Sequence, residues 1–403
     1  MYYDYRRRST ISPLVFIVPL FLILGLGAVQ MLRGLPAVSA TTTFPSTSII
    51  GEPHQLPLPS TGASMIAVDG LGVLGMQNPD ARRPIASVTK MMTAYVILKN
   101  HPLQPGETGP TFTMTAANGA RYLQMLNEDQ STLPVTAGMQ LTQLEMLQGL
   151  LIASANNFAE ILAAWDAGTQ QAFVTRMNEE ARALGMTNTT YADASGFLAA
   201  STSTAQDQLT LARAAMRNPV FAQTVAMSQV RLTGIGIVPA VNQLLGQEGV
   251  VGIKTGFTEE AGGNLAFAAK RQANGQQVDI IGIVMGQPTR PLAFEATRRL
   301  LQSLGQGLQP ARVVSAGQPV GTIRSEWGGG DVEVVVGEDA QMLLWPGMTL
   351  ETTVEYDAIQ APRAAGDQVG WLNLKLGEQE RRVPLTLAED LRKAGLIWRL
   401  TRI

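Results

Sequence analysis

Apolar positions near the N-terminus predict a membrane signal over residues 1–40. An uncharged run extends from Ser9 to Leu32, its apolar centre is Leu14–Val29, and three arginines (residues 6–8) precede it. A long apolar run with a basic flank on one side only predicts a helix that enters the membrane with its N-terminus in the cytoplasm. The rest of the chain is then expected on the extracytoplasmic face of the cell membrane.

The segment after this run leaves open whether the signal is cleaved. Val38-Ser39-Ala40 fits the small-residue rule for signal peptidase, but it lies eleven residues beyond Val29. Because the enzyme usually cuts closer to the apolar run, an uncleaved signal-anchor is favoured and a cleaved peptide remains the alternative. Residues 41–62 are rich in Thr, Ser and Pro without a helical or strand period, which predicts a linker that tethers the folded part.

Residues 63–309 alternate between strand and helix patterns. The predicted elements are a strand at 63–69, a buried helix from near Ser87 to 100, two apolar helices within 141–168 joined near 153–157, an amphipathic helix closed by Gly185, strands at 250–258, 262–272 and 278–287, and a helix at 289–308. A strand, a helical middle and terminal strands predict an α+β domain with one antiparallel sheet covered by helices.

Beyond residue 310 the pattern changes to short alternating strands divided by Gly, Pro and Asp. Such a pattern predicts a separate, small all-β domain over 310–403. Its last segment, Leu391–Ile403, mixes four basic residues with apolar ones. This segment is expected either to touch lipid or to pack on the β domain.

Composition removes several kinds of chemistry. The 403 residues include no Cys and only two His, so thiolate metal sites, a Cys nucleophile, a His-rich metal site and a Ser-His-Asp triad are disfavoured. No metal or other cofactor is expected. The net charge of −2 offers no argument for nucleic acid. Only six residues are Lys, so a lysine inside a motif carries weight.

Three short motifs remain for catalysis. In Ser87-Val88-Thr89-Lys90, residues three apart share a helix face, so the Lys90 amine can reach the Ser87 hydroxyl near the helix start. Alone, this motif more often marks solvated helix surface or an end-of-helix salt bridge. Ser154-Ala155-Asn156 occupies a break between two apolar helices, where a helix cap is the simpler interpretation.

The third motif is Lys254-Thr255-Gly256 on a predicted strand. A lysine there either protects a sheet edge from aggregation or presents a cation to an anionic substrate, while Gly256 lets a ligand approach the backbone. The three motifs begin 67 and then 100 residues apart. Their combination and order are far more specific than any one of them, and are typical of penicillin-binding proteins and class A β-lactamases.

With these motifs the sequence resembles the serine D-alanyl-D-alanine carboxypeptidases, the low-molecular-mass penicillin-binding proteins of the penicillin-binding protein 5 type. Further similar segments are RRPIASVTKMMTAY, LLIASANNFAEILA, LGMTNTTYADASGF and GVVGIKTGFTEEAGGNLAFAA, and the similarity extends from about Ala63 through the β domain. The resemblance implies a β-lactamase/transpeptidase-like fold, peptidoglycan pentapeptide as substrate, and β-lactams as inhibitors.

The resemblance also implies roles for individual residues. Ser87 would be the acylated nucleophile, Lys90 its base and Ser154 a proton relay, while Asn156 would orient Lys90 and the substrate amide. Lys254 and Thr255 would hold the substrate carboxylate. The backbone N–H groups of Ser87 and Phe257 would form the oxyanion hole. Lys90 must be partly neutral to act as a base, and we expect burial and the charge of Lys254 to lower its pKa.

Two positions depart from the common pattern of such enzymes. Ala155 stands where Gly is frequent, and Phe257 stands where His is frequent, so pH dependence and substrate preference are left open. The alternatives are a DD-endopeptidase that cuts cross-links, a class A-like β-lactamase, and a catalytically silent cell-wall-binding module. Between Gly185 and Leu209 the only carboxylates are Asp193 and Asp207, with no Glu to activate a deacylating water, so slow release of penicillin is expected.

Overall fold

The computed structural model describes residues 12–36, 38–273, 276–328 and 330–402, so the predicted basic flank at residues 6–8 lies outside the described residues. The chain divides into two units. The catalytic unit comprises residues 51–310 and 343–348, and the β unit comprises residues 1–50, 311–342 and 349–403.

The catalytic unit is built on a five-stranded antiparallel sheet with the strand order β11-β12-β13-β3-β4. Its strands are β3 (Ala63–Val68), β4 (Gly72–Gln77), β11 (Val250–Thr258), β12 (Gly262–Ala273) and β13 (Gln276–Gln287). The first strand of this sheet along the chain, β3, pairs with the last, β13, which closes the helical middle into one domain. This agrees with the antiparallel sheet that the sequence predicted.

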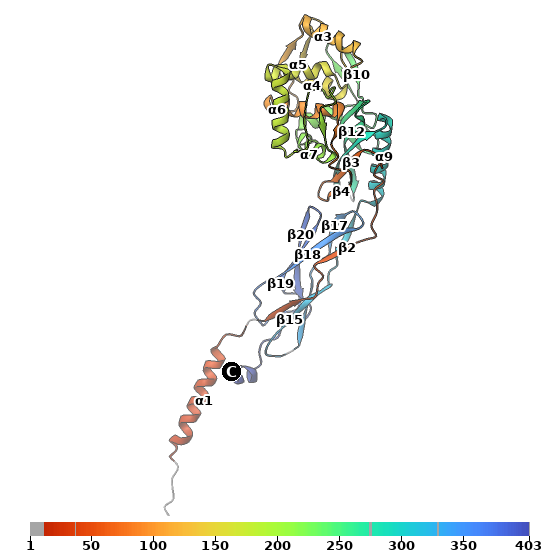
Figure 1. Cartoon of the computed structure of the whole chain (residues 1–403). Coiled ribbons are helices and arrows are strands. Elements are labelled where there is room, and N and C mark those ends of the chain that lie inside the picture. Colours follow the sequence, from red (N-terminus) through yellow and green to blue (C-terminus); the bar gives the residue numbers. More distant parts are fainter. Residues whose placement is uncertain (1–11, 37, 274–275, 329, 403) are drawn as a thin grey trace, which may run out of the picture. The chain divides into compact units, whose positions relative to one another are not determined.

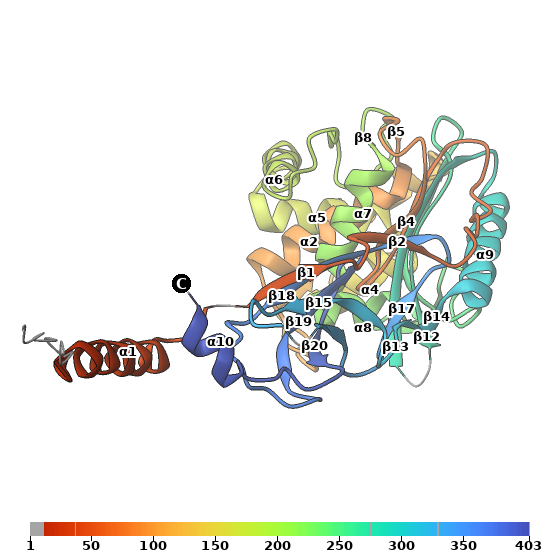
Figure 2. The same ribbon diagram turned by 90° about the horizontal axis from the view of Figure 1, so that it is seen from below.

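Helices cover both faces of this sheet (Figures 1 and 2). The helices of the unit are η1 (Ala86–Thr89), α2 (Lys90–Asn100), α3 (Ala116–Asn127), α4 (Gln143–Ile152), α5 (Asn156–Ala167), α6 (Gln170–Ala183), α7 (Ala205–Met216), α8 (Pro219–Val225) and α9 (Arg290–Gly307). Short two-stranded pairs join them: β5 (Arg83–Pro84) with β8 (Thr202–Ser203), β6 (Thr111–Thr113) with β7 (Gln140–Thr142), and β9 (Gln229–Leu232) with β10 (Gly236–Pro239).

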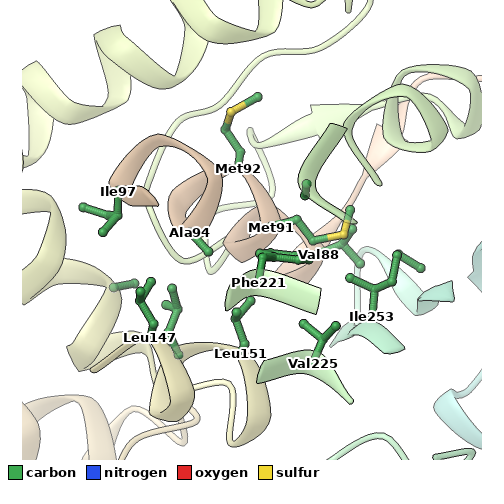
Figure 3. Close-up of a cluster of buried hydrophobic side chains, with 14 of the residues drawn as sticks. Val88, Met91, Met92, Ala94, Ile97, Leu147, Leu151, Phe221, Val225 and Ile253 are labelled. Carbon is green, nitrogen blue, oxygen red and sulfur yellow. The ribbon is translucent and has the colours of Figure 1, made fainter. Parts of the chain in front are cut away.

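The side chains of β12 show how the sheet separates two cores. Ala266 and Ala268 face the core formed with α2, α4, α5, α7 and α8, while Leu265 and Phe267 face the core beside α9. This is the period of two expected for a strand buried on both faces. In Figure 3 the helical core surrounds Met91 of α2 with side chains from α4, α8 and β11. The N-terminal end of α2 is therefore fixed by packing.

The β unit contains a seven-stranded antiparallel sheet with the order β1-β15-β16-β20-β19-β18-β2. The strands from the C-terminal part are β15 (Pro319–Arg324), β16 (Asp331–Val336), β18 (Met348–Tyr356), β19 (Gln368–Leu376) and β20 (Gln379–Leu387), and a separate pair joins β14 (Gln309–Val314) to β17 (Ala340–Leu344). Burial alternates along β16, whose valines at 332, 334 and 336 are buried.

Both edges of this sheet come from the start of the chain, which corrects the predicted linker. β1 (Ser39–Thr42) pairs with β15, and β2 (Thr47–Ile50) pairs with β18. Residues 41–62 are thus not a tether throughout. The pattern was missed because both strands are only four residues long, and their side chains are exposed or partly exposed, so no apolar alternation marks them.

The apolar N-terminal segment forms α1 (Leu14–Leu32), which is long and apolar enough to cross a membrane. In the same unit, α10 (Leu396–Thr401) contacts α1. The Arg402 guanidinium donates to the carbonyl oxygen of Gln30 at 2.9 Å, in the last turn of α1, and to that of Gly34 at 3.0 Å, just beyond the helix. Leu391 forms a β-bridge with Arg363. The final segment therefore attaches to the β unit while Leu396 and Ile397 stay exposed.

Candidate active site

The first motif lies where a tight turn enters α2. Ala86 has a φ of 47°, in the left-handed region that non-glycine residues seldom adopt, and Ser87 follows it within η1. Lys90 is the first residue of α2, one turn after Ser87. Its Nζ donates to Ser87 Oγ at 2.8 Å. The predicted helix start is confirmed, with a 3₁₀ turn carrying the hydroxyl and the α-helix carrying the amine.

Lys90 is fully buried, and no carboxylate hydrogen-bonds to it within the described residues. Its second acceptor is the carbonyl oxygen of Ser195 at 2.8 Å. Burial lowers the pKa of Lys90 to about 7, and the charge of Asp193 opposes part of that shift. Neither the solvated-surface interpretation nor the salt-bridge interpretation of this motif fits such an environment.

The segment 193–197 contacts Lys90 through the Ser195 carbonyl oxygen, and the sequence had given this segment no role. The Asp193 carboxylate accepts from the hydroxyls of Ser195 (2.6 Å) and Ser201 (2.7 Å) and from the backbone N–H of Phe197 (2.8 Å). A Cβ on Gly196 would lie 1.8 Å from the carbonyl oxygen of Ala86. The segment therefore packs directly on the turn before Ser87, and ADASGF was the only sequence signal for it.

The second motif is not the helix cap that was its simpler interpretation. Ser154 has a φ of 64° between α4 and α5, and the N-cap position of α5 is Ala155, whose side chain cannot cap. Ser154 Oγ instead accepts a hydrogen bond from Lys254 Nζ at 3.0 Å. The two motifs, 100 residues apart in the sequence, are brought together inside the protein.

Lys254 lies on β11, which is an edge strand of the sheet, yet its side chain is only 1% exposed. A lysine that protects an edge from aggregation would face solvent, so that interpretation fails. Burial lowers the pKa of Lys254 well below its usual value, and the charges of Lys90 and Arg290 lower it further. Burial is the largest cause of the lowered pKa of Lys90, and the repulsion between the Lys90 and Lys254 charges acts in the direction that was expected.

Gly256 lets β11 pack closely on the turn that carries Ser87. A Cβ at Gly256 would lie 2.8 Å from the carbonyl oxygen of Ile85 and 3.1 Å from the Ser87 nitrogen. The absence of a side chain lets β11 approach this backbone closely. Phe257 follows with a half-exposed ring, and the Arg290 guanidinium lies 5.7 Å from the ring centroid. Arg290 is a further cation near the site that the sequence did not indicate.

Asn156 begins α5 and is 4% exposed. Its Nδ2 donates to Gln130 Oε1 at 2.7 Å and not to Lys90, which it was expected to orient. Its Oδ1 is buried and has no hydrogen-bond partner among the described residues. A buried amide oxygen without a partner is costly unless a ligand supplies the donor. The structure thus joins Lys90 to Ser87 and Lys254 to Ser154, and it leaves an unsatisfied acceptor on Asn156, two residues after Ser154.

Comparison with known proteins agrees with this geometry. The family described as D-alanyl-D-alanine carboxypeptidase matches residues 54–289. The chain belongs to this family. The match confirms the resemblance drawn from the motifs, and it makes the protein a serine hydrolase of the D-alanyl-D-alanine carboxypeptidase type.

Individual members of the family and solved structures are similar over long stretches. The D-alanyl-D-alanine carboxypeptidase DacC of Escherichia coli (strain K12) is 27% identical, over 92% of this chain and 94% of its own. The D-alanyl-D-alanine endopeptidase of Pseudomonas aeruginosa is 32% identical, over 59% and 75%.

Among solved structures, penicillin binding protein 5 from Haemophilus influenzae covers 85% of this chain and 99% of its own, at 23% identity and a TM-score of 0.59. The Streptomyces K15 DD-transpeptidase covers 62% and 98%, at 26% identity and a TM-score of 0.55. These neighbours confirm the β-lactamase/transpeptidase-like fold of the catalytic unit.

Proposed function

We propose that the protein removes the terminal D-alanine from peptidoglycan stem peptides through an acyl-enzyme on Ser87, and that penicillin acylates the same hydroxyl. The observation that carries this proposal is the fully buried Lys90, whose amine lies 2.8 Å from Ser87 Oγ while carrying a pKa near 7. A neutral amine at this distance can take the hydroxyl proton near physiological pH.

In the acylation step Ser87 Oγ attacks the carbonyl carbon of the penultimate D-alanine as its proton passes to Lys90. The developing oxyanion would be held by the backbone N–H groups of Ser87 and Phe257. The close packing of Gly256 on the Ser87 backbone supports this arrangement, because it brings the strand that carries the Phe257 N–H next to the turn. The unsatisfied Asn156 Oδ1 would accept the substrate's amide N–H.

The leaving group is the amine of the terminal D-alanine. Ser154 would pass it a proton, since its hydroxyl already takes part in the hydrogen bond with Lys254. Lys254 and Thr255 would bind the terminal carboxylate. Because burial and neighbouring cations lower the pKa of Lys254 in the free site, an arriving carboxylate would favour protonation of this amine and so be recognised as it binds.

Hydrolysis of the acyl-enzyme by water would complete the reaction, and slow release of penicillin is expected. Asp193 accepts hydrogen bonds from four donors, which are the backbone N–H groups of Ser195 and Phe197 and the hydroxyls of Ser195 and Ser201. Asp207 accepts from the backbone N–H of Asn188 and from the Thr189 hydroxyl. With both carboxylates engaged in holding the chain, neither is arranged to activate a deacylating water as a class A β-lactamase would require.

Labelling with a fluorescent penicillin tests the proposal. The wild-type protein is expected to take up one covalent label per chain, and Ser87→Ala none, with the labelled peptide identified by mass spectrometry. Release of free D-alanine from a pentapeptide should also be lost in Ser87→Ala. A wild-type protein that takes up no label, or one that hydrolyses penicillin with many turnovers per minute, would contradict the proposal.

A DD-endopeptidase is the second candidate, favoured by the 32% identity to the relative that carries this name. It would use the same residues on a cross-link in place of a terminal D-alanine. Comparison of kcat/KM for a pentapeptide with that for a cross-linked dimer separates the two activities. We expect the pentapeptide to be preferred at least tenfold, and the reverse preference would make the endopeptidase the principal activity.

We also propose that α1 anchors the protein and that its folded units act on the extracytoplasmic side. The support is a helix of 19 residues with no charged side chain. Membrane extraction at alkaline pH should leave the full chain with the lipid. Protease added from outside should digest both units. Recovery of a chain that starts at or after residue 41 would instead show cleavage of the signal.

A further inference from the structure

Asn156 hydrogen-bonds to a short chain of polar side chains that leads away from the reacting groups. Its Nδ2 donates to Gln130 Oε1 at 2.7 Å, and Gln130 Nε2 donates to Glu128 Oε2, also at 2.7 Å. Gln130 is 8% exposed, and Asn156 is 4% exposed. The loop that carries Gln130 is tied to α5, since the Asn156 backbone N–H donates to the Ser131 carbonyl oxygen at 2.8 Å.

The Glu128 carboxylate sets the direction of the hydrogen bonds in this series of side chains. An ionised carboxylate can only accept hydrogen bonds, whereas a side-chain amide can present either its oxygen or its nitrogen. Glu128 therefore requires the nitrogen of Gln130 to face it, which turns the Gln130 oxygen toward Asn156. That oxygen in turn requires the nitrogen of Asn156. The Asn156 oxygen is left facing the other way, buried and without a partner in the part of the chain that the structure describes.

The orientation matters for the proposed reaction. An amide oxygen at this place can accept the N–H of a peptide substrate, and a rotated amide would present two donors that repel it. The rotation exchanges atoms of nearly equal size, so packing alone discriminates poorly between the two orientations. A hydrogen-bond partner of fixed polarity discriminates well, because rotation of the Asn156 amide would set its oxygen against the Gln130 oxygen, two acceptors opposed in a buried site.

We infer that Gln130, directed by Glu128, is a positioning residue that holds the Asn156 amide with its oxygen toward the substrate. The inference rests on the proposed function, since it assigns a role within that site. Gln130 touches Asn156 and does not touch Ser87, Lys90, Ser154 or Lys254 through any described hydrogen bond. Its effect is therefore expected on recognition of one substrate N–H and not on the reactivity of Ser87.

A double-mutant cycle between protein and substrate tests this role. One substrate is a peptide that ends in D-Ala-D-Ala, and the other has D-lactate in place of the penultimate D-alanine, which replaces the recognised N–H by an ester oxygen. In the wild type this replacement should lower kcat/KM about tenfold. In Gln130→Met, kcat/KM for the peptide should fall about tenfold, and kcat/KM for the ester should stay almost as in the wild type.

Two further variants keep the test decisive. In the exchange E128Q/Q130E, the central carboxylate accepts from both neighbours, so the Asn156 orientation and the wild-type preference for the peptide should return. Glu128→Gln changes an exposed residue and so cannot disturb the buried core. It should lower the preference for the peptide over the ester to an intermediate value. The matched control is Gln124→Met, which removes the other donor to Glu128 and should leave the preference unchanged.

The outcomes separate this inference from the function on which it rests. A wild type that neither binds penicillin covalently nor releases D-alanine would overturn both. A wild type that does so, combined with an equal peptide-to-ester preference in wild type, Gln130→Met and Glu128→Gln, would overturn the inference alone. Loss of preference in Gln130→Met with its return in the exchanged pair, at similar thermal stability, supports it.

Discussion

The two units of the protein differ in how closely they follow the usual rules for charged side chains, backbone conformation and buried polar atoms. In the β unit, β16 alternates buried valines with exposed acidic residues, and the charged groups of β15 and β16 pair at the surface through Arg324 and Asp331. In the catalytic unit, two lysines are buried, and Ala86 and Ser154 adopt positive φ values. An amide oxygen of Asn156 also lacks a partner.

Four of these exceptions lie at residues proposed to react or to bind the substrate: Lys90, Lys254, Ser154 and Asn156. Positive φ values also occur elsewhere in this unit, at Asn78, Asp129 and Glu248. Each exception costs stability by itself: a positive φ costs about 1–3 kcal/mol, and a buried unsatisfied acceptor costs a similar amount. Such costs persist only where the surrounding core holds the chain in place, as the side chains around Met91 do in Figure 3. The comparison predicts that substitutions in one unit change the chemistry, whereas those in the other change stability alone.

Lys90→Met should have the largest effect. Removal of the base should slow acylation by penicillin about a thousandfold or more. Because a buried amine is costly, the free energy of unfolding should stay the same or rise. Lys99→Met is the matched control on the same helix, since its amine is exposed and pairs with Glu180. A variant with rapid acylation would remove Lys90 from the mechanism.

The pH profile of acylation should follow Lys90. The amine acts as a base only when neutral, and its pKa is about 7. Below this value the rate should fall tenfold per pH unit, about a hundredfold at pH 5, and above it the rate should level off. Stopped-flow measurement of penicillin acylation records the rate, while the final extent of labelling stays constant. A rate that is flat from pH 5 to 8 would argue against a neutral lysine.

Gly256→Ala should reduce activity by about ten- to a hundredfold. The new methyl group would press on the carbonyl oxygen of Ile85 and on the Ser87 nitrogen, and would push the nucleophile away from β11. Gly119→Ala in α3 is the control, because the nearest atom to its Cβ is at 3.4 Å. Unchanged acylation in Gly256→Ala would mean that the close approach of β11 is not needed for the reaction.

Leu372→Ala should leave the rate of acylation unchanged. This side chain is fully buried in the β unit, and its loss should lower the free energy of unfolding by about 2–5 kcal/mol. Lys375→Ala, on an exposed position of the same strand, should change neither quantity. Calorimetry and penicillin labelling on the same samples check both. A slower acylation at the working temperature would show that the two units do not differ as described.

Most strands and helices of the catalytic unit could be predicted from local sequence patterns. The strands at 250–258 and 262–272 and the helix at 289–308 were predicted nearly at their observed bounds, because long runs of buried residues mark them. Motif order was enough to select Lys90 and Lys254 from six lysines. What could not be predicted depends on contacts between distant segments.

Three contacts between distant segments could not be predicted from the sequence. The bond between Ser195 and Lys90 spans 105 residues, and no local pattern in ADASGF announces it. Gln130 occupies a loop whose composition looks ordinary, and only its contact with Asn156 gives it a role. The pairing of β1 with β15 spans most of the chain and uses side chains that would suit a linker equally well.

The pairing of β1 has a consequence for how far the protein can reach from the bilayer. Only residues 33–38 separate the end of α1 from the first strand of the β unit. Six extended residues span about 20 Å at most. With α1 in the membrane, as proposed, this short linker keeps the β unit close to the lipid headgroups. The hydrogen bonds of Arg402 also attach the last segment of the β unit to the C-terminal end of α1. A soluble version of the protein should therefore begin before Ser39, because a later start would remove an outer strand of the sheet.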